Sequence, residues 1–358
     1  MGILDIVPEL LLLVAENLSL EDLSSLRSTC SRVQHVLNSR FRKLCLQDVG
    51  ELTALQWAAV RDHAELIKFA ISNGGEIDTP FRGQLTIAAL GASCRLDGPG
   101  AIYSCSLANN SADIKIKEPK IRTPLFLAAC SGSAKAIEVL LELGARMQCF
   151  GEMESPLHIS AKKGDVECMQ AFARAGFDIN ARGARDRTIL HEAMYGGVEV
   201  MKYILQLEGG TNLVNARTSK GLTPLHFIQP EGGFSSKELE VELLLQHGAD
   251  IYARENDGST PAHYFAHGGD VGSLRLLIAA GFDLNSRGLL GLTILHFAVH
   301  GGKEMMEYLL GLEGGRMIID VGDNRQRTPM HHAFMYLRVT EMRVLLLHGT
   351  ARIPLPSS

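Results

Sequence analysis

Apolar residues recur at helical spacing in pairs of short stripes along most of the chain. The second stripe of a pair ends at a Gly-containing turn, as Met306, Leu309 and Leu310 do before Gly314. Spacings of three and four residues place apolar side chains on one face of a helix, and glycine ends a helix by adopting the left-handed conformation without strain. Polar, extended stretches such as residues 178–182 separate one pair from the next. The pattern predicts an all-α chain of repeated helix pairs joined by extended segments, here called fingers.

The first helix of each pair opens with a shared four-residue motif, which is complete at Thr223-Pro224-Leu225-His226. Thr or Ser caps a helix by accepting a backbone N–H, and Pro is well suited to the first helical position. The motif returns, intact or altered, at steps of 32 to 37 residues. A period of this length marks a stack of repeats in which neighbours supply each other's core. The nine openings are Thr53, Thr86, Thr123, Ser155, Thr188, Thr223, Thr260, Thr293 and Thr328.

This motif and its period resemble the ankyrin repeat, whose consensus opens with Thr-Pro-Leu-His. The resemblance implies a helical solenoid of about nine units over residues 46–357, in which the motif histidine ties neighbouring units together. Two segments depart from the pattern. Residues 91–120 lack a Leu-rich second helix, so a degenerate unit or a long loop is expected there. Residues 229–237 are expected to form an insertion between the two helices of one unit.

Residues 3–45 do not follow the repeat and instead show three short apolar stripes. Pro8 and Glu9 favour a helix start there, and Ser19 with Asp22 favours a second one. Three short helices in about 40 residues bury little surface, so such a segment needs a partner or a neighbouring domain. The segment resembles an F-box, from which it departs at Val7 and Val33. The matching residues are Pro8, Glu9, Val14, Leu18, Asp22, Leu23, Leu26, Cys30 and Arg32.

The F-box resemblance implies that residues 3–45 dock into the Skp-type adaptor of a cullin–RING ubiquitin ligase. Their apolar side chains would otherwise form an exposed patch, which is typical of a protein-binding surface. An alternative is that the three helices only cap the repeat stack. The residues expected to bind the adaptor are Leu4, Pro8, Leu11, Val14, Leu18, Leu23 and Leu26.

Composition narrows the class of protein further. The net charge is −5 and 21% of the 358 residues are charged, which is typical of a folded domain and not of a nucleic-acid-binding tail. Seven scattered cysteines without a Cys-x-x-Cys pair favour a reducing compartment, the cytoplasm or nucleus. The short apolar run at residues 10–14 has acidic flanks and no preceding basic residues, which argues against export. No apolar run has the length of a membrane span.

Motifs of enzymes are missing from the sequence. There is no phosphate-binding Gly-rich loop, no G-x-G-x-x-G and no G-x-S-x-G elbow. His263 with His267, and His296 with His300, are spaced to share a helix face and hold a metal. However, His263 and His296 belong to the structural motif. We therefore expect no catalytic residue, no metal site and no cofactor.

Partner binding is expected on the fingers and just beyond the first helices, because ankyrin proteins use these positions. Leu289 and Leu290 stand at a turn where other units have polar residues, and they either contact a partner or fold back onto the neighbouring finger. The expected function is recruitment of an unknown protein substrate to an SCF-type ubiquitin ligase; the alternative is an ankyrin scaffold outside ubiquitination. The candidate substrate-binding residues are Lys162, Lys163, Arg185, Arg187, Tyr195, Lys220, His267, Leu289, Leu290, His300, Arg325, Met335 and Tyr336.

Overall fold

The computed structural model describes residues 48–49, 52–72, 74–78, 123–147, 155–227 and 237–350. The chain divides into two compact parts, residues 1–178 and residues 179–358. The predicted F-box at residues 3–45, the segment 91–120 and residues 229–236 of the predicted insertion lie outside the described residues. The opening at Thr86 lies outside them as well.

In the residues that the structure describes, the N-terminal part shows three helix pairs that come after a two-stranded hairpin. Their first helices pack in one row, with α8 between α4 and α10, and their second helices pack in another, with α9 between α5 and α11. The hairpin strands are two residues long each, so they leave the predicted all-α class unchanged. The elements are β1 (Asp48–Val49), β2 (Leu52–Thr53), α4 (Ala54–Val60), α5 (Ala64–Ser72), α8 (Pro124–Ser131), α9 (Ala134–Glu142), α10 (Pro156–Lys163) and α11 (Val166–Arg174).

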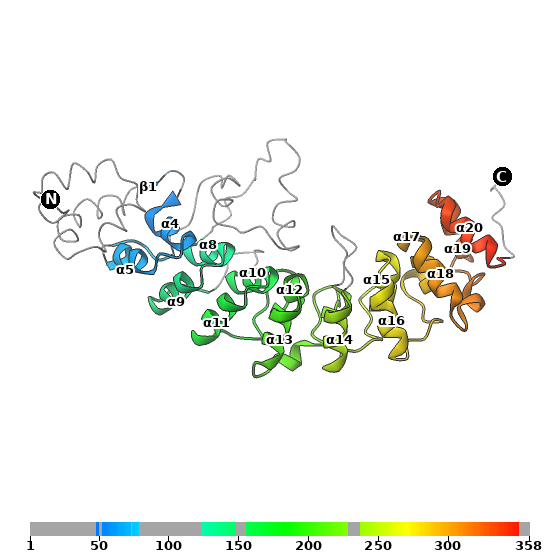
Figure 1. Ribbon diagram of the computed structural model, residues 1–358, viewed down its shortest axis with the longest axis horizontal. Coiled ribbons are helices and arrows are strands. Elements are labelled where there is room, and N and C mark those ends of the chain that lie inside the picture. The colour runs from blue at the N-terminus through cyan, green and yellow to red at the C-terminus, as the bar shows by residue number, and fades with distance from the viewer. Residues whose placement is uncertain are drawn as a thin grey trace, which may run out of the picture. The chain divides into compact units, whose positions relative to one another are not determined.

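The C-terminal part contains five successive repeats, which open at Thr188, Thr223, Thr260, Thr293 and Thr328. First helices pack on first helices and second helices on second helices, so the repeats form two layers (Figure 1). The helices are α12 (Ile189–Gly196), α13 (Val198–Gln206), α14 (Glu238–Gln246), α15 (Pro261–Gly268), α16 (Val271–Ala279), α17 (Ile294–Gly301), α18 (Lys303–Gly311), α19 (Pro329–Met335) and α20 (Val339–Leu347). Short 3₁₀ turns are η2 (Ala184–Asp186), η3 (Gly210–Leu213), η4 (Pro224–His226), η5 (Leu289–Gly291) and η6 (Gly315–Ile318).

The core is a series of interfaces between neighbouring repeats. Phe265, Leu274, Leu277 and Leu309 are fully buried, and each lies on a helix that packs against the equivalent helix of the adjacent repeat. Complete burial of such a side chain stabilises the fold by roughly 2 kcal/mol. No single repeat encloses these side chains by itself. Stability in this part therefore depends on contacts between repeats.

Two glycines allow the first helices of adjacent repeats to approach closely. Gly269, with φ of 76°, comes directly after α15, and a Cβ atom there would lie 2.6 Å from the carbonyl oxygen of Gly301. A Cβ on Gly301 would in turn lie 2.0 Å from the carbonyl oxygen of Ala266. A larger residue at either position would force α15 and α17 apart.

The repeat that opens at Thr223 has a shorter first helical segment than its neighbours. Its motif is complete, yet it forms only the 3₁₀ turn η4, which ends at His226. The second helix of this repeat, α14, begins at Glu238. The cap and proline therefore start a helical turn here without producing a full first helix in the described residues. Of the helices that the structure describes, none has the length and hydrophobicity that crossing a bilayer demands.

Candidate protein-binding surface

Four motif histidines join neighbouring repeats, as the resemblance implied. His191 Nδ1 accepts a hydrogen bond from the Thr188 backbone N–H at 3.1 Å and lies 2.7 Å from Thr188 Oγ1. His191 Nε2 donates to the carbonyl oxygen of Leu222, one repeat further on, at 3.1 Å. The equivalent Nε2 donors and carbonyl acceptors, at 2.9 to 3.4 Å, are His226 with Ser259, His263 with Ser286 and His296 with Arg327.

These histidines are held in the neutral form. One ring nitrogen must accept and the other must donate, and a protonated ring has no acceptor. Burial, the main cause, lowers the pKa of His191 to about 3. It also lowers to about 4 the pKa values of His226, His263 and His296. With both nitrogens engaged, these side chains are unsuited to acid–base chemistry at neutral pH or to metal binding. Among the described residues, no group of three or more His, Cys, Asp or Glu is arranged to hold a metal ion.

Four arginines form a second connection between repeats, here called the arginine ladder: Arg182, Arg217, Arg254 and Arg287. Arg254 Nη1 donates to the carbonyl oxygen of Gly258 in its own finger and to that of Arg287 in the next, both at 2.7 Å. Arg182 and Arg287 also bridge two fingers, while Arg217 donates to the next finger at 2.6 Å. A guanidinium suits this role because its several N–H groups are fixed in one plane.

The fingertips are joined to one another by further hydrogen bonds. The Ser219 backbone N–H and Oγ donate to the carbonyl oxygen of Arg185 at 3.1 and 3.2 Å. The Asn256 backbone N–H donates to the carbonyl oxygen of Lys220 at 3.0 Å, and that of Asn324 donates to Leu290 at the same distance. The fingertips are therefore joined through backbone groups with help from the Ser219 side chain, and the side chains of Arg185, Lys220 and Leu290 are exposed to solvent.

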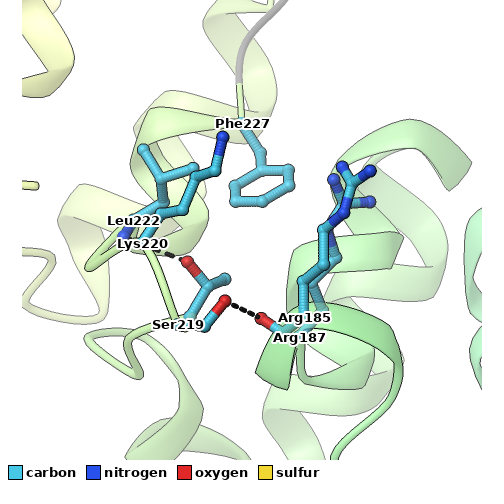
Figure 2. Close-up of a pocket in the computed structure, with 7 residues that line it drawn as sticks. Arg185, Arg187, Ser219, Lys220, Leu222 and Phe227 are labelled. Atoms are coloured by element: carbon cyan, nitrogen blue, oxygen red, sulfur yellow. Dashed lines mark hydrogen bonds between the residues drawn. The ribbon is translucent and has the colours of Figure 1, made fainter. Parts of the chain in front are cut away.

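One small depression lies between two of these fingers. It has a volume of about 90 Å³, and Figure 2 shows the guanidinium groups of Arg185 and Arg187 on one side and the Lys220 side chain on the other, with the Phe227 ring between them. Arg185 and Lys220 are exposed. The complete lining is Arg185, Arg187, Thr218, Ser219, Lys220, Leu222 and Phe227. Three of the predicted substrate-binding residues thus come together at one place.

Arg187 is fixed at the inner side of this depression. Its Nη1 lies 3.1 Å from Oε1 of the buried Glu192, and its Cζ lies 4.7 Å from the centroid of the Phe227 ring. Phe227 also packs edge-on against His191 and Tyr195, at centroid distances of 5.1 and 6.3 Å. The wall made by Arg187 and Phe227 is therefore rigid, and the charge of Arg187 is balanced by Glu192.

A second group of predicted residues forms an aromatic row at the ends of α15, α17 and α19. The rings of His267 and His300 stack at 5.0 Å, and His300 meets the Tyr336 ring edge-on at 4.6 Å. Burial, and to a smaller extent the Arg338 charge, lowers the pKa of His267. Burial lowers the pKa of His300 too, with smaller contributions from the His267 and Arg338 charges. Met335 and Tyr336 are both more than half exposed.

The remaining predicted residues belong to neither group. Leu289 is 37% exposed and Leu290 is 54% exposed, so neither side chain is buried against the neighbouring finger. Arg325 is exposed on the next fingertip. Lys162 and Lys163 lie in the last turn of α10, in the N-terminal part.

Sequence reasoning did not single out Phe227, Glu192 or the arginine ladder. Phe227 comes directly after a motif histidine, and Glu192 is an acidic residue on a helix face that should be apolar. Both residues could therefore be recognised in the sequence as departures from the repeat pattern. The ladder shows in the sequence as arginines 35, 37 and 33 residues apart at positions 182, 217, 254 and 287. Each precedes a fingertip, but its acceptors are backbone atoms that leave no mark on the sequence.

The family-level comparison agrees with the geometry. A model described as ankyrin repeats (three copies) matches residues 100–183, 157–228, 195–288, 234–315 and 266–354. The chain belongs to the ankyrin-repeat family. Ankyrin repeats are typically non-catalytic binding scaffolds, so this membership points to protein–protein interaction. No F-box family match is found in this ankyrin protein.

Three curated relatives are similar to part of this chain. The human transient receptor potential cation channel subfamily A member 1 is 25% identical over 238 residues, which is 63% of this ankyrin chain and 20% of the relative. Its Drosophila melanogaster counterpart is 25% identical over 231 residues, 59% and 18% of the two chains. A probable E3 ubiquitin-protein ligase, XBOS33 of Oryza sativa subsp. japonica, is 34% identical over 112 residues, 30% and 21%. The chain spans about a fifth of the length of these curated relatives.

Among solved structures, the ankyrin repeat domain of Bcl-3 is similar with a TM-score of 0.48 and 21% identity. The similarity covers 70% of this chain and 95% of that domain.

Proposed function

We propose that this ankyrin protein is a non-catalytic, substrate-recruiting subunit of an SCF-type ubiquitin ligase. Residues 3–45 bind a Skp-type adaptor and, through it, a cullin. The repeats bind the protein that is to be ubiquitinated. The observation that carries the proposal is an F-box-like sequence placed ahead of repeats whose fingertips form one hydrogen-bonded row.

The substrate-binding half of the proposal is supported by a division among the side chains of the repeats. One set holds the repeats together, and another set is exposed to a partner. The motif histidines and the arginine ladder direct their polar atoms at backbone carbonyls, so they hold the repeats together. Side chains at the fingertips, among them Arg185, Lys220 and Leu290, are exposed on that frame. A rigid frame that presents varied side chains suits protein recognition, because little conformational entropy is lost when a partner binds.

The ligase half is supported by sequence. Pro8, Glu9, Asp22 and Leu23 lie where an F-box has equivalent residues. One relative of the repeats is named as a probable E3 ubiquitin-protein ligase. The mechanism is proximity: a substrate bound to the repeats is held at high effective concentration near the ligase, and this chain performs no chemical step. The proposal places the protein in the cytoplasm or nucleus.

Co-precipitation with the full-length chain tests the proposal. The tagged wild-type protein is expected to capture the Skp-type adaptor and the cullin. The double variant Pro8→Ala/Leu11→Ala is expected to lose at least about tenfold in captured adaptor, because apolar anchors dominate such interfaces. The control is Leu346→Ala/Leu347→Ala, which removes two exposed leucines from α20 and should leave capture unchanged.

Equal capture by the Pro8→Ala/Leu11→Ala variant, or absence of adaptor from the wild-type precipitate, would refute the ligase assignment. The protein would then be an ankyrin scaffold that works outside ubiquitination.

A further inference from the structure

We propose that the depression between residues 179–188 and residues 214–223 binds carboxylate side chains of an acidic peptide segment. This inference deepens the proposed function and rests on it in one respect, that the acidic segment belongs to a recruited protein. The proposal rests on the local charge, on two exposed cations without an ion pair among the described residues, and on the shape and rigidity of the depression.

Positive charge is concentrated in these two fingers. They carry five cations, Arg182, Arg185, Arg187, Arg217 and Lys220, and one carboxylate, Asp186, which gives 5 − 1 = +4. The whole chain has a net charge of −5. A local excess opposite in sign to the chain as a whole attracts anionic ligands to this site.

Three of these five cations already interact with other groups of the protein, and two are available to a ligand. Arg182 and Arg217 donate to backbone carbonyls, and Arg187 is paired with the buried Glu192. Arg185 and Lys220 are exposed, and neither has an ion pair among the described residues closer than 4.0 Å. They face each other across the depression (Figure 2).

The surroundings strengthen an ionic contact at this place. The Phe227 ring and the Leu222 side chain exclude water from one wall, which raises the strength of an electrostatic interaction. A volume of about 90 Å³ admits a carboxylate group with part of its side chain. The next finger carries Glu255, whose carboxyl interacts with the Lys220 charge.

The backbone at Arg185 indicates a role other than stability. Arg185 and Asp186 both adopt the left-handed conformation, with φ of 60° and 58°. In the next finger, Lys220 takes the place of Arg185, and Gly221, with φ of 78°, takes the place of Asp186. A residue with a side chain costs roughly 1 kcal/mol in this region, and Gly and Asn are tolerated best. The arginine is thus a poor choice for the turn itself, while its side chain supplies half of the available charge.

Fluorescence anisotropy with the full-length protein tests the site. The probe is a labelled peptide with four consecutive Glu residues in a Gly/Ser context, and the comparison peptide has Gln in their place. A phosphoserine peptide with the same flanks forms a third arm. The Glu peptide is expected to bind, with affinity that falls as salt rises. Because two exposed ion pairs are lost, Arg185→Asn/Lys220→Gln is expected to weaken binding by up to about 30-fold.

The matched control is Lys202→Gln, which removes an exposed lysine on α13 and should change affinity less than twofold. The Arg185→Asn variant is expected to unfold at the wild-type temperature or above it, which separates loss of binding from loss of fold. Equal binding of the Gln peptide, unchanged affinity in the double variant, or binding of the phosphoserine peptide alone would overturn the inference. The double variant is expected to capture the Skp-type adaptor normally, so failure here and failure of the ligase proposal give different results.

Discussion

The motif histidine joins two repeats because its two ring nitrogens have opposite hydrogen-bonding roles. In His296, Nδ1 accepts from the Thr293 N–H at 3.1 Å, while Nε2 donates to the Arg327 carbonyl at 2.9 Å. The first bond orients the helix start, and the second crosses to the next finger. One neutral side chain therefore fixes a local turn and a contact between repeats.

Replacement of this histidine should destabilise the fold. His296→Ala leaves a buried N–H and a carbonyl without their partners and opens a small cavity, so the free energy of unfolding is expected to fall by about 2–4 kcal/mol. Urea denaturation monitored by circular dichroism measures this change. His247→Ala, at an exposed histidine whose ring contacts a carbonyl of its own helix, should change it by less than about 0.5 kcal/mol. A similar small loss at both positions would contradict the bridging role.

At the residue scale, the sequence predicted what depends on local spacing. The cap and the motif histidine are three residues apart, so their contact is a consequence of helical geometry alone. Arg187, Glu192 and Phe227 were not predicted as a set, because Phe227 belongs to the next repeat and its contact with Arg187 depends on how the two repeats pack.

The finger is the element that connects frame to surface. Its base is held by the arginine ladder and its tip by a backbone hydrogen bond to the preceding finger. These two attachments restrict the fingertip to one conformation. Partner-binding side chains can therefore be exchanged at the tip while the base keeps its geometry.

The ladder gives a second stability prediction. Arg254→Ala removes two hydrogen bonds from a charged donor, so the free energy of unfolding is expected to fall by about 1–2 kcal/mol. The free energy of unfolding of Arg254→Lys should lie between those of Arg254→Ala and the wild type, since an ammonium lacks the planar fork that reaches both carbonyls. Thermal unfolding of the purified proteins measures both. Arg316→Ala, at an exposed arginine on η6, serves as the control, and an equal effect there would show that the ladder adds nothing specific.

At the element scale, helix starts were more predictable than helix lengths. Thr123, Thr188, Thr260, Thr293 and Thr328 each directly precede a helix, as the motif indicates. At Thr223 the same motif gives only a 3₁₀ turn, because a cap stabilises the start of a helix and cannot extend it. Extension depends on the residues beyond the motif and on the neighbouring repeats.

Across the C-terminal part, four similar histidines make stability depend on pH. Their ordinary pKa is 6.5 and their folded values are about 3 to 4, so the unfolded chain takes up protons that the folded chain does not. Their contribution is complete well above pH 6.5 and is lost progressively as the pH falls from about 6.5 towards 4. Asp323 acts only at lower pH: burial alone would raise its pKa, but hydrogen bonds from Arg327, Arg325 and His332 hold that pKa well below its usual range.

Denaturant unfolding at pH 8, 7.5, 6.5 and 5 tests this linkage. The urea midpoint is expected to change little between pH 8 and 7.5 and to fall steadily from pH 6.5 to 5. The variant His296→Gln is expected to show a shallower decline of the urea midpoint, because one of the titrating histidines is gone. A midpoint that stays constant down to pH 5 would contradict the neutral, buried state of these rings.

At the scale of the molecule, the sequence predicted the fold because the period repeats. Nine similar openings constrain the architecture far more than any one of them does, whereas the binding surface has no period. Arg185 and Lys220 were predicted as surface residues individually, yet their convergence on one depression required the packed fingers. The assignments at residues 3–45 remain predictions, since they lie outside the described residues.

The arginine ladder also gives the stack a direction. Each arginine of the ladder donates a hydrogen bond to a carbonyl oxygen of the next finger along the chain. The last acceptor is Gly322, which accepts from Arg287 and has no guanidinium of its own. The finger that contains Gly322 is closed by Asp323 and Arg327 within itself. A copied repeat inserted before residue 287 would therefore find both a donor and an acceptor. The same repeat joined after residue 350 would meet a finger that has Gly322 in place of the ladder arginine, so this protein can be lengthened within the ladder more readily than beyond it.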